Sequence, residues 1–331
     1  MKNDVYACPV GHIRVMENRL FGRAAVERML EAQDEEAVLS VLCEYGYELD
    51  TEQSCEELFA RAEVQPCFQV MEFAPEPELF YVFLYKNDSY NAKVLLKNEI
   101  MKRETPAHIL SPYGTVEIKK MQKAFTNRDF RACPPAMAAV LTGITACLSG
   151  FEEVREIELA LDRAYYEDCY LLADHAKVRE AGGFVRSYME LNADLSNIRT
   201  ALRLNAMKIE KKGSWFMPGT LTGDFLTKIQ QSDDADIYAA LAQAGYERVL
   251  ENSDGVFCWS AIEKNCDDIL LDFVRERRAN AFGIEPLFGY ILARQREIMI
   301  ARMIVLGRRN GLPTETIRAR IRQLYVDSFV K

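Results

Sequence analysis

A six-residue pattern occurs three times in this chain, at intervals of 106 and 103 residues. Each copy begins with an acid and ends with a base, and the copies read DSYNAK at 88–93, DLSNIR at 194–199 and EIMIAR at 297–302. The first two copies share an asparagine, Asn91 and Asn197, at the fourth position. Repetition at a long and nearly constant interval is typical of a fold that is built from similar units.

The spacing of glycines extends the repeat beyond the six residues. Gly114 follows Asp88 by 26 residues, and Gly219 follows Asp194 by 25 residues. Both glycines lie in a proline-containing turn. We therefore predict three helical repeats, which span residues 1–110, 111–212 and 213–331.

Two further segments match at an offset of 199 residues. One runs from Asp34 to Gly46 and the other from Asp233 to Gly245. Aspartate accepts hydrogen bonds from the free N–H groups at a helix start, and glycine adopts the left-handed conformation past a helix end. We expect a helix in each segment. The middle repeat shows no such segment over 127–150, so the repeat is imperfect there.

Apolar residues recur at three- and four-residue steps along most of the chain, which predicts helices, and no convincing alternating strand is found. Each repeat should close on a long helix, over 79–101, 184–208 and 287–307. The third of these is apolar almost all round and should be the most buried element. A last basic helix is expected to run to Val330.

The composition is that of a globular protein, with 331 residues of which 49% are hydrophobic. No apolar run approaches the roughly 18 residues that a membrane-spanning helix needs. The longest run, residues 136–150, should form a core helix. The nine cysteines include no Cys-x-x-Cys pair, and no signal-peptide pattern precedes them, so we expect reduced thiols in a cytoplasmic protein.

Charge is distributed unevenly along the chain. The net charge is −9, but the part from Arg275 onward carries +7 and the remainder carries −16. An acidic body disfavours nucleic acid as a partner, whereas a basic end permits a local docking patch. The candidate docking residues are Arg308, Arg309, Arg318, Arg320 and Arg322.

Sequence motifs of catalysis and of metal binding are missing. The chain has no Gly-x-x-x-x-Gly-Lys loop, no Gly-x-Gly-x-x-Gly loop and no Gly-x-Ser-x-Gly elbow. Its three histidines form no His-x-x-x-His pair, and a metal between Cys8 and His12 is disfavoured because Pro9 and Gly11 separate them. We expect no catalytic residue, no metal and no cofactor.

The repeated pattern has two interpretations. In the structural one, its polar side chains are buried and need hydrogen-bond partners, and this set comprises Asp88, Asn91, Asp194, Asn197 and Glu297. In the functional one, three equivalent helices present these groups to a partner at a common centre. For the terminal bases Lys93, Arg199 and Arg302, a solvated face and a partner contact stay equally open.

Three stretches resemble one known family. Residues 83–97, 188–204 and 296–302, the last followed by NGLP at 310–313, are similar to the three repeats of the C subunit of the V/A-type rotary ATPases and ATP synthases, a relative of the d subunit of eukaryotic vacuolar ATPases. The likeness covers nearly the whole chain. The start, CPVGHIR at 8–14, departs from the uninterrupted first helix of the family.

The resemblance implies an all-α, funnel-shaped molecule with three pseudo-threefold helical bundles and no catalytic activity. It implies a peripheral protein of the central stalk, on the cytoplasmic face of the membrane. There it would link the axle subunits to the proteolipid ring in proton or sodium transport. The C-terminal arginines would then contact the ring or nearby lipid headgroups, or instead pair with acids of their own chain.

A protein of another class remains as the alternative. An all-helical enzyme with a central cavity would need several groups with perturbed pKa values in one pocket.

Overall fold

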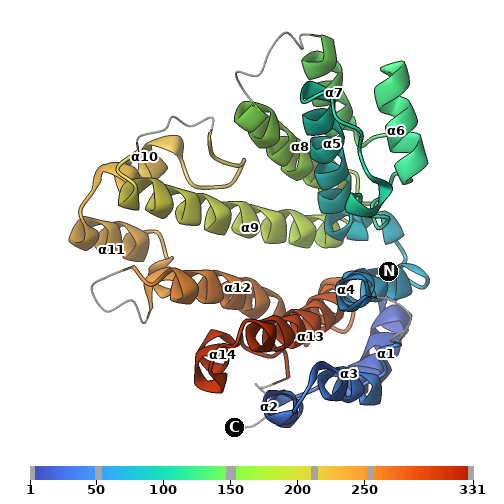
Figure 1. Ribbon diagram of the computed structural model, residues 1–331, viewed down its shortest axis with the longest axis vertical. Coiled ribbons are helices and arrows are strands. Elements are labelled where there is room, and N and C mark those ends of the chain that lie inside the picture. Colours follow the sequence, from blue (N-terminus) through green and yellow to red (C-terminus); the bar gives the residue numbers. More distant parts are fainter. Residues whose placement is uncertain (1–3, 49–53, 147–153, 210–214, 252–256, 327–331) are drawn as a thin grey trace. The chain divides into compact units, whose positions relative to one another are not determined.

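The computed structural model describes residues 4–48, 54–146, 154–209, 215–251 and 257–326. Within these residues the chain is all helical and contains no strand, which confirms the predicted fold class. The helices are α1 (Ala7–Met16), α2 (Arg23–Glu31), α3 (Glu35–Glu44), α4 (Cys55–Met71), α5 (Tyr85–Ile100), α6 (Ile118–Asn127), α7 (Pro135–Ala146), α8 (Val154–Asp174), α9 (Arg179–Ala206), α10 (Gly223–Gln231), α11 (Asp234–Gln243), α12 (Trp259–Arg275), α13 (Glu285–Arg309) and α14 (Thr314–Arg320) (Figure 1).

The chain forms two compact units. The first contains residues 1–77 and 233–331, and the second contains residues 78–232. The three expected repeats are shorter segments than these units, and their boundaries stay a prediction.

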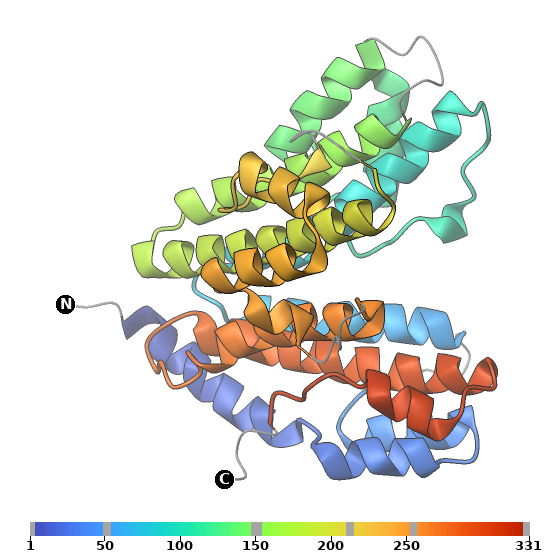
Figure 2. The ribbon, with the colours of Figure 1, turned by 90° about the vertical axis from the view of Figure 1, so that its left-hand side faces the viewer.

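In the first unit, helix α13 contacts α1, α2, α3 and α4 from the start of the chain as well as α12 and α14 (Figure 2). Phe21, Met29 and Phe59 share one apolar core with Ile298 and Ile304. Sixteen of the 25 residues of α13 are buried, against fifteen of 28 in α9, so α13 is the more buried of the two longest helices, as its sequence predicts. Helix α13, from the C-terminal part of the chain, is therefore the central helix on which the N-terminal helices α1 to α4 pack.

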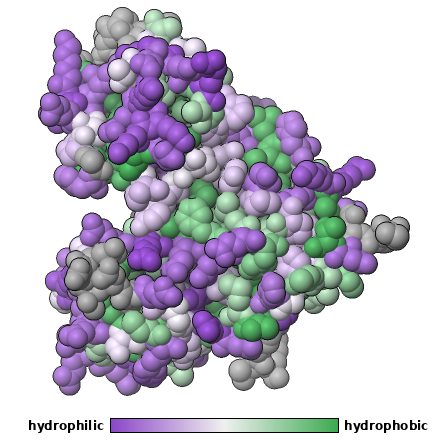
Figure 3. Space-filling view, turned by 90° about the vertical axis from the view of Figure 1, so that its right-hand side faces the viewer, coloured by the Kyte–Doolittle hydropathy of each residue, from purple (hydrophilic) through white to green (hydrophobic). Residues whose placement is uncertain are grey.

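In the second unit, helix α8 contacts α5, α7 and α9, and α9 contacts α10. Leu96, Met121, Phe125 and Leu161 belong to its core. Helix α6 is amphipathic, and Figure 3 shows hydrophilic side chains over the upper part of one face of the molecule, where α6 lies.

Helix starts and ends follow the expected capping chemistry in the matched segments. The Asp34 side chain accepts from the Ala37 N–H and the Asp233 side chain accepts from the Asp236 N–H. Gly46 and Gly245 take left-handed φ angles of 81° and 80°. Both expected helices are present as α3 and α11.

Helix α7 has its capping carboxylate supplied from another helix. Asp168 of α8 accepts from the N–H groups of Ala136 (2.7 Å) and Met137 (3.0 Å). The missing local aspartate is thus replaced by one 32 residues later. Met137 and Leu141 of α7 are buried in the core of the second unit, whereas Gly143 and Ala146 are exposed, so the expected core helix packs on the core with one side. The rest of the expected helix, residues 147–150, lies outside the described residues.

Other expected boundaries also need correction. The first closing helix divides into a 3-10 segment, Pro77–Phe83, and α5, because i to i+3 bonding holds the chain tighter before the α-helix begins. Helix α14 ends at Arg320, and Ile321 is extended, so the last helix does not run to Val330. The sequence CPVGHIR lies inside α1 without a break, since Pro9 falls in the first turn, where its missing N–H costs no helical bond.

Candidate functional site

The repeated acids Asp88 and Asp194 are buried in matching surroundings. Asp88 accepts from the N–H groups of Thr115 (2.9 Å) and Val116 (3.0 Å), and Asp194 accepts from those of Thr220 (2.8 Å) and Leu221 (3.0 Å). The hydroxyl of each threonine also donates to its aspartate. Each closing helix is thereby bonded to the turn that starts the next helix, and we name each such arrangement a carboxylate clamp. For Asp88, burial raises the pKa, and the donors oppose that effect.

The glycines of the two turns make this approach possible. A Cβ atom at Gly114 would lie 2.9 Å from Cγ of Asp88, and one at Gly219 would lie 3.1 Å from Cγ of Asp194, with a carboxylate oxygen closer still. Neither φ angle is positive. Both glycines are therefore required by close contact and not by backbone conformation.

The repeated asparagines bind the same turns. The Asn91 amide donates to the Ser111 carbonyl and accepts from the Ser111 N–H, both at 2.8 Å. The Asn197 amide makes the same pair of bonds with the Met217 backbone, at 2.9 and 2.7 Å. These buried amides have the backbone partners that the structural interpretation requires.

The third acid, Glu297, is bonded to the start of the chain. Its carboxylate accepts from the Phe21 N–H (2.7 Å), the Tyr47 hydroxyl (2.6 Å) and Arg294 (3.0 Å). Phe21 lies two residues before α2, just as Val116 and Leu221 lie two residues before α6 and α10. Burial raises the pKa of Glu297 to about 7, although these donors act in the opposite direction.

The terminal bases of the pattern differ in their surroundings. Lys93 forms an ion pair with Asp162. Arg302 lies 3.5 Å from a carboxylate oxygen of Glu63 and over the ring of Phe59. Arg199 is half-buried, and its charge opposes the effect of burial, which raises the pKa of Tyr166.

The C-terminal arginines mostly contact their own unit. Three of them form ion pairs, which are Arg309 with Glu35, Arg318 with Glu27 and Arg322 with Asp267. Arg308 donates to the Leu30 carbonyl. Arg320 is exposed, and its carbonyl accepts from Arg322. Their role in docking therefore stays a proposal.

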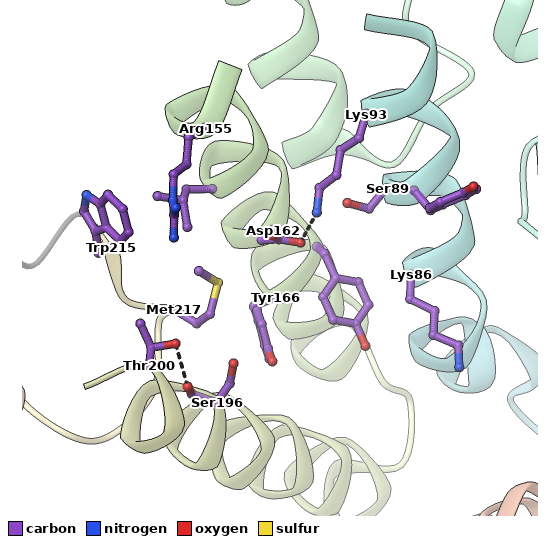
Figure 4. Close-up of a pocket in the computed structure, with 13 residues that line it drawn as sticks. Lys86, Ser89, Lys93, Arg155, Asp162, Tyr166, Ser196, Thr200, Trp215 and Met217 are labelled. Carbon is purple, nitrogen blue, oxygen red and sulfur yellow. Dashed lines mark hydrogen bonds and ion pairs between the residues drawn. The ribbon is translucent and has the colours of Figure 1, made fainter. Parts of the chain in front are cut away.

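Lys93 also lines a pocket of about 400 Å³ inside the second unit, between α5, α8, α9 and residues 215–217 (Figure 4). Burial raises the pKa values of two tyrosines in its lining, Tyr165 and Tyr166. A raised phenol pKa keeps the proton on the oxygen at neutral pH, which does not produce a general base.

Comparison with known proteins decides the family. The family described as "ATP synthase (C/AC39) subunit" matches residues 9–320. This chain belongs to the C/AC39 family.

Three relatives show how far the likeness extends. The C subunit of the V-type sodium ATPase of Enterococcus hirae is 23% identical over 264 residues, which cover 77% of each chain. The C subunit of the A-type ATP synthase of Haloferax volcanii is 25% identical and covers 74% of this chain and 73% of its own. The C subunit of the V-type ATP synthase of Thermus thermophilus is 23% identical and covers 74% of both chains.

Two structural findings accompany C/AC39 membership. No helix in the described part of the chain is long and apolar enough to cross a membrane. Among the same residues, no group of three His, Cys, Asp or Glu side chains could hold a metal ion. Cys8 is exposed, and the His12 ring lies against that of Phe73, with centroids 5.2 Å apart.

Several buried polar and charged residues of the first unit were not predicted from the sequence. Arg294 and Tyr47 complete the surroundings of Glu297. Arg296 and Asp268 form a buried ion pair at 2.9 Å. One signal was present: charged residues at 294, 296 and 297 in an otherwise apolar helix require buried partners.

Proposed function

We propose that this chain is the non-catalytic coupling subunit of a V/A-type rotary ATPase or ATP synthase. It would sit in the central stalk as a socket between the axle subunits and the cytoplasmic face of the proteolipid ring, peripheral to the membrane. The observation that carries the proposal is the family match over residues 9–320, together with relatives named as the C subunits of a sodium ATPase and of ATP synthases.

The carboxylate clamps support a mechanical role. A part that transmits torque must resist deformation, and close-packed protein interiors are poorly compressible. Asp88, Asp194 and Glu297 each hold a long helix to the backbone that begins another helix. Breaking such a clamp would leave a buried carboxylate without its donors, which costs several kcal/mol.

We further propose that the clamps mark three equivalent repeats arranged about a pseudo-threefold axis in a funnel. The third repeat would be completed by the start of the chain, because Phe21 takes the place next to Glu297 that Val116 takes next to Asp88.

Reconstitution tests the coupling role. Membranes from cells that lack this chain should lose most of their ATP-driven ion uptake, while the catalytic head keeps its ATPase activity in detached form. Adding the purified chain should return the head to the membrane and restore uptake. The chain alone should not hydrolyse ATP. Normal ion uptake by membranes without the chain would contradict the proposal.

A further inference from the structure

The pocket of the second unit gathers positive charge. Lys86 and Lys93 line it from α5, and Arg155 lines it from α8 (Figure 4). Its volume, about 400 Å³, lies within the range of small-molecule sites. Lys86 and Lys93 are seven residues apart, which is two helical turns, so they share one face of α5.

The lining contains these three bases and one acid. Asp162 is the acidic residue of the lining, and it is paired with Lys93. An ammonium group has three N–H donors, so this pair leaves two for a further acceptor. The lining thus carries a net charge of +2 in a chain whose net charge is −9. Such a local excess of positive charge attracts anions.

The opposite wall is flat and apolar. The Arg155 guanidinium lies 4.2 Å from the ring centroid of Trp215, and Met217 lies beside them (Figure 4). Leu159 also belongs to the lining. The Tyr166 hydroxyl donates to the Asn192 side chain (2.7 Å). A ligand in the pocket would therefore contact the ring of this tyrosine more than its hydroxyl. Arginine on an indole face is a common platform for planar groups.

We propose that this pocket binds a small organic phosphate. Its phosphoryl group would contact Lys93, Lys86 would add positive charge two helical turns away, and its planar apolar part would lie against Trp215 and Met217. Lysine binds a phosphoryl group as a point charge and arginine binds it through its planar fork, so Lys93 and Arg155 both suit this group. Inorganic phosphate alone would leave much of the 400 Å³ and the apolar wall unused. The site is separate from the coupling role and does not depend on it.

A fluorescence titration tests the proposal on the full chain. The chain has two tryptophans, so Trp259→Phe leaves Trp215 as the single emitting indole. Phenyl phosphate combines a ring with a phosphoryl group, and phenol and inorganic phosphate each supply one part. We expect phenyl phosphate to change Trp215 emission saturably, and each part alone to bind at least about tenfold more weakly, because ionic hydrogen bonds and ring contacts both contribute. Equal binding of phenyl phosphate and inorganic phosphate would overturn the proposal.

Variants locate the binding. Calorimetry should show that Arg155→Gln weakens phenyl phosphate binding by about tenfold. Lys86→Gln removes a more distant charge and should weaken binding by a smaller factor, and both residues are at exposed positions. Lys119→Gln removes the same charge from the exposed face of α6, away from the pocket lining, and should leave the affinity unchanged. Thr200→Phe should fill the pocket and abolish binding, with helicity checked by circular dichroism.

If Lys119→Gln weakens binding as much as Arg155→Gln, general surface charge is responsible and the pocket is not the site. If an acidic peptide binds and phenyl phosphate does not, the pocket takes a partner segment and the proposal is wrong.

Discussion

Asp88 and Asp194 accept matching hydrogen bonds from turns that differ in sequence, so backbone geometry, and not a particular neighbouring side chain, is what each clamp preserves. Threonine is the exception, since Thr115 and Thr220 add a hydroxyl donor at the same place. A buried carboxylate that gains three donors keeps much of the hydrogen bonding it would have in water. The glycine next to each threonine lets the turn come this close.

Replacement of Gly219 by alanine should therefore damage a clamp without removing any polar group. The new Cβ would overlap the Asp194 carboxylate, so the turn must move, and we expect the free energy of unfolding to fall by about 1–3 kcal/mol. Urea denaturation measures this change. Gly223→Ala is the matched control, because a Cβ there meets nothing within 4 Å. An unchanged midpoint for Gly219→Ala would show that the close approach is unimportant.

The raised pKa of Glu297 predicts that the protein becomes less stable as the pH rises. Burial raises its pKa from 4.5 to about 7, so the folded chain holds a proton that the unfolded chain releases. The stability that this proton contributes is present below pH 4.5 and is lost as the pH rises to 7. The shift corresponds to about 3 kcal/mol.

Thermal unfolding between pH 5 and 8 tests this prediction. The Glu297→Gln variant does not titrate, so its melting temperature should fall less over this range than that of the native chain. Glu276→Gln changes an exposed glutamate of the same unit and should keep the native slope. Parallel curves for Glu297→Gln and the native chain would mean that Glu297 has an ordinary pKa.

At the scale of elements, the three closing helices end alike. Two residues past the end of each helix, and fourteen after the repeated acid, is a residue with a left-handed φ: Lys102 (53°), Lys208 (54°) and Gly311 (67°). The next N–H bonds back five residues in every case, from Arg103 to Asn98, from Ile209 to Leu204 and from Leu312 to Gly307. This is the Schellman ending, which favours glycine. Two of the three helices place a lysine there.

Glycine in place of lysine at such a position should stabilise the protein, and alanine in place of glycine should destabilise it. Lys208→Gly should raise the free energy of unfolding by up to about 1 kcal/mol, because glycine removes the cost of a left-handed residue but adds entropy to the unfolded chain. Gly311→Ala should lower it by about 1 kcal/mol. Chemical denaturation measures both. Lys208→Ala keeps the strain and serves as control, so a gain in Lys208→Ala equal to that in Lys208→Gly would assign the effect to the side chain.

At the scale of the whole molecule, the sequence predicts what local patterns encode. Helix type, the caps at Asp34 and Asp233, and the repeated acids follow from periodicity and spacing. Hydrogen-bond partners that lie far apart in the sequence do not follow from periodicity or spacing. The N–H of Phe21 that bonds Glu297 belongs to every residue type except proline, so no sequence signal marks it. The carboxylate of Asp168 caps a helix that begins over thirty residues earlier, and only the packing of α7 on α8 selects it.

The C-terminal arginines offer a test of docking at this scale, resting on the proposed function. Arg318 is paired with Glu27 and Arg322 with Asp267, whereas Arg320 is exposed. If these arginines dock the chain on the ring or on anionic headgroups, charge reversal at 318, 320 and 322 should weaken attachment and make it more sensitive to salt. Sedimentation of reconstituted chain with ring-containing membranes, at several ionic strengths, measures this attachment.

The internal ion pairs provide the control that separates docking from folding. Glu27→Gln breaks the same pair as Arg318→Glu but leaves the arginine in place. Exposed pairs contribute about 0–1 kcal/mol, so both changes should lower the melting temperature only slightly. Docking by the arginines predicts that Arg318→Glu and Arg320→Glu reduce attachment, while Glu27→Gln maintains it because the basic group is then available to the membrane. Attachment that survives the triple reversal, together with a large fall in melting temperature in both Arg318→Glu and Glu27→Gln, would assign these arginines to the stability of the first unit.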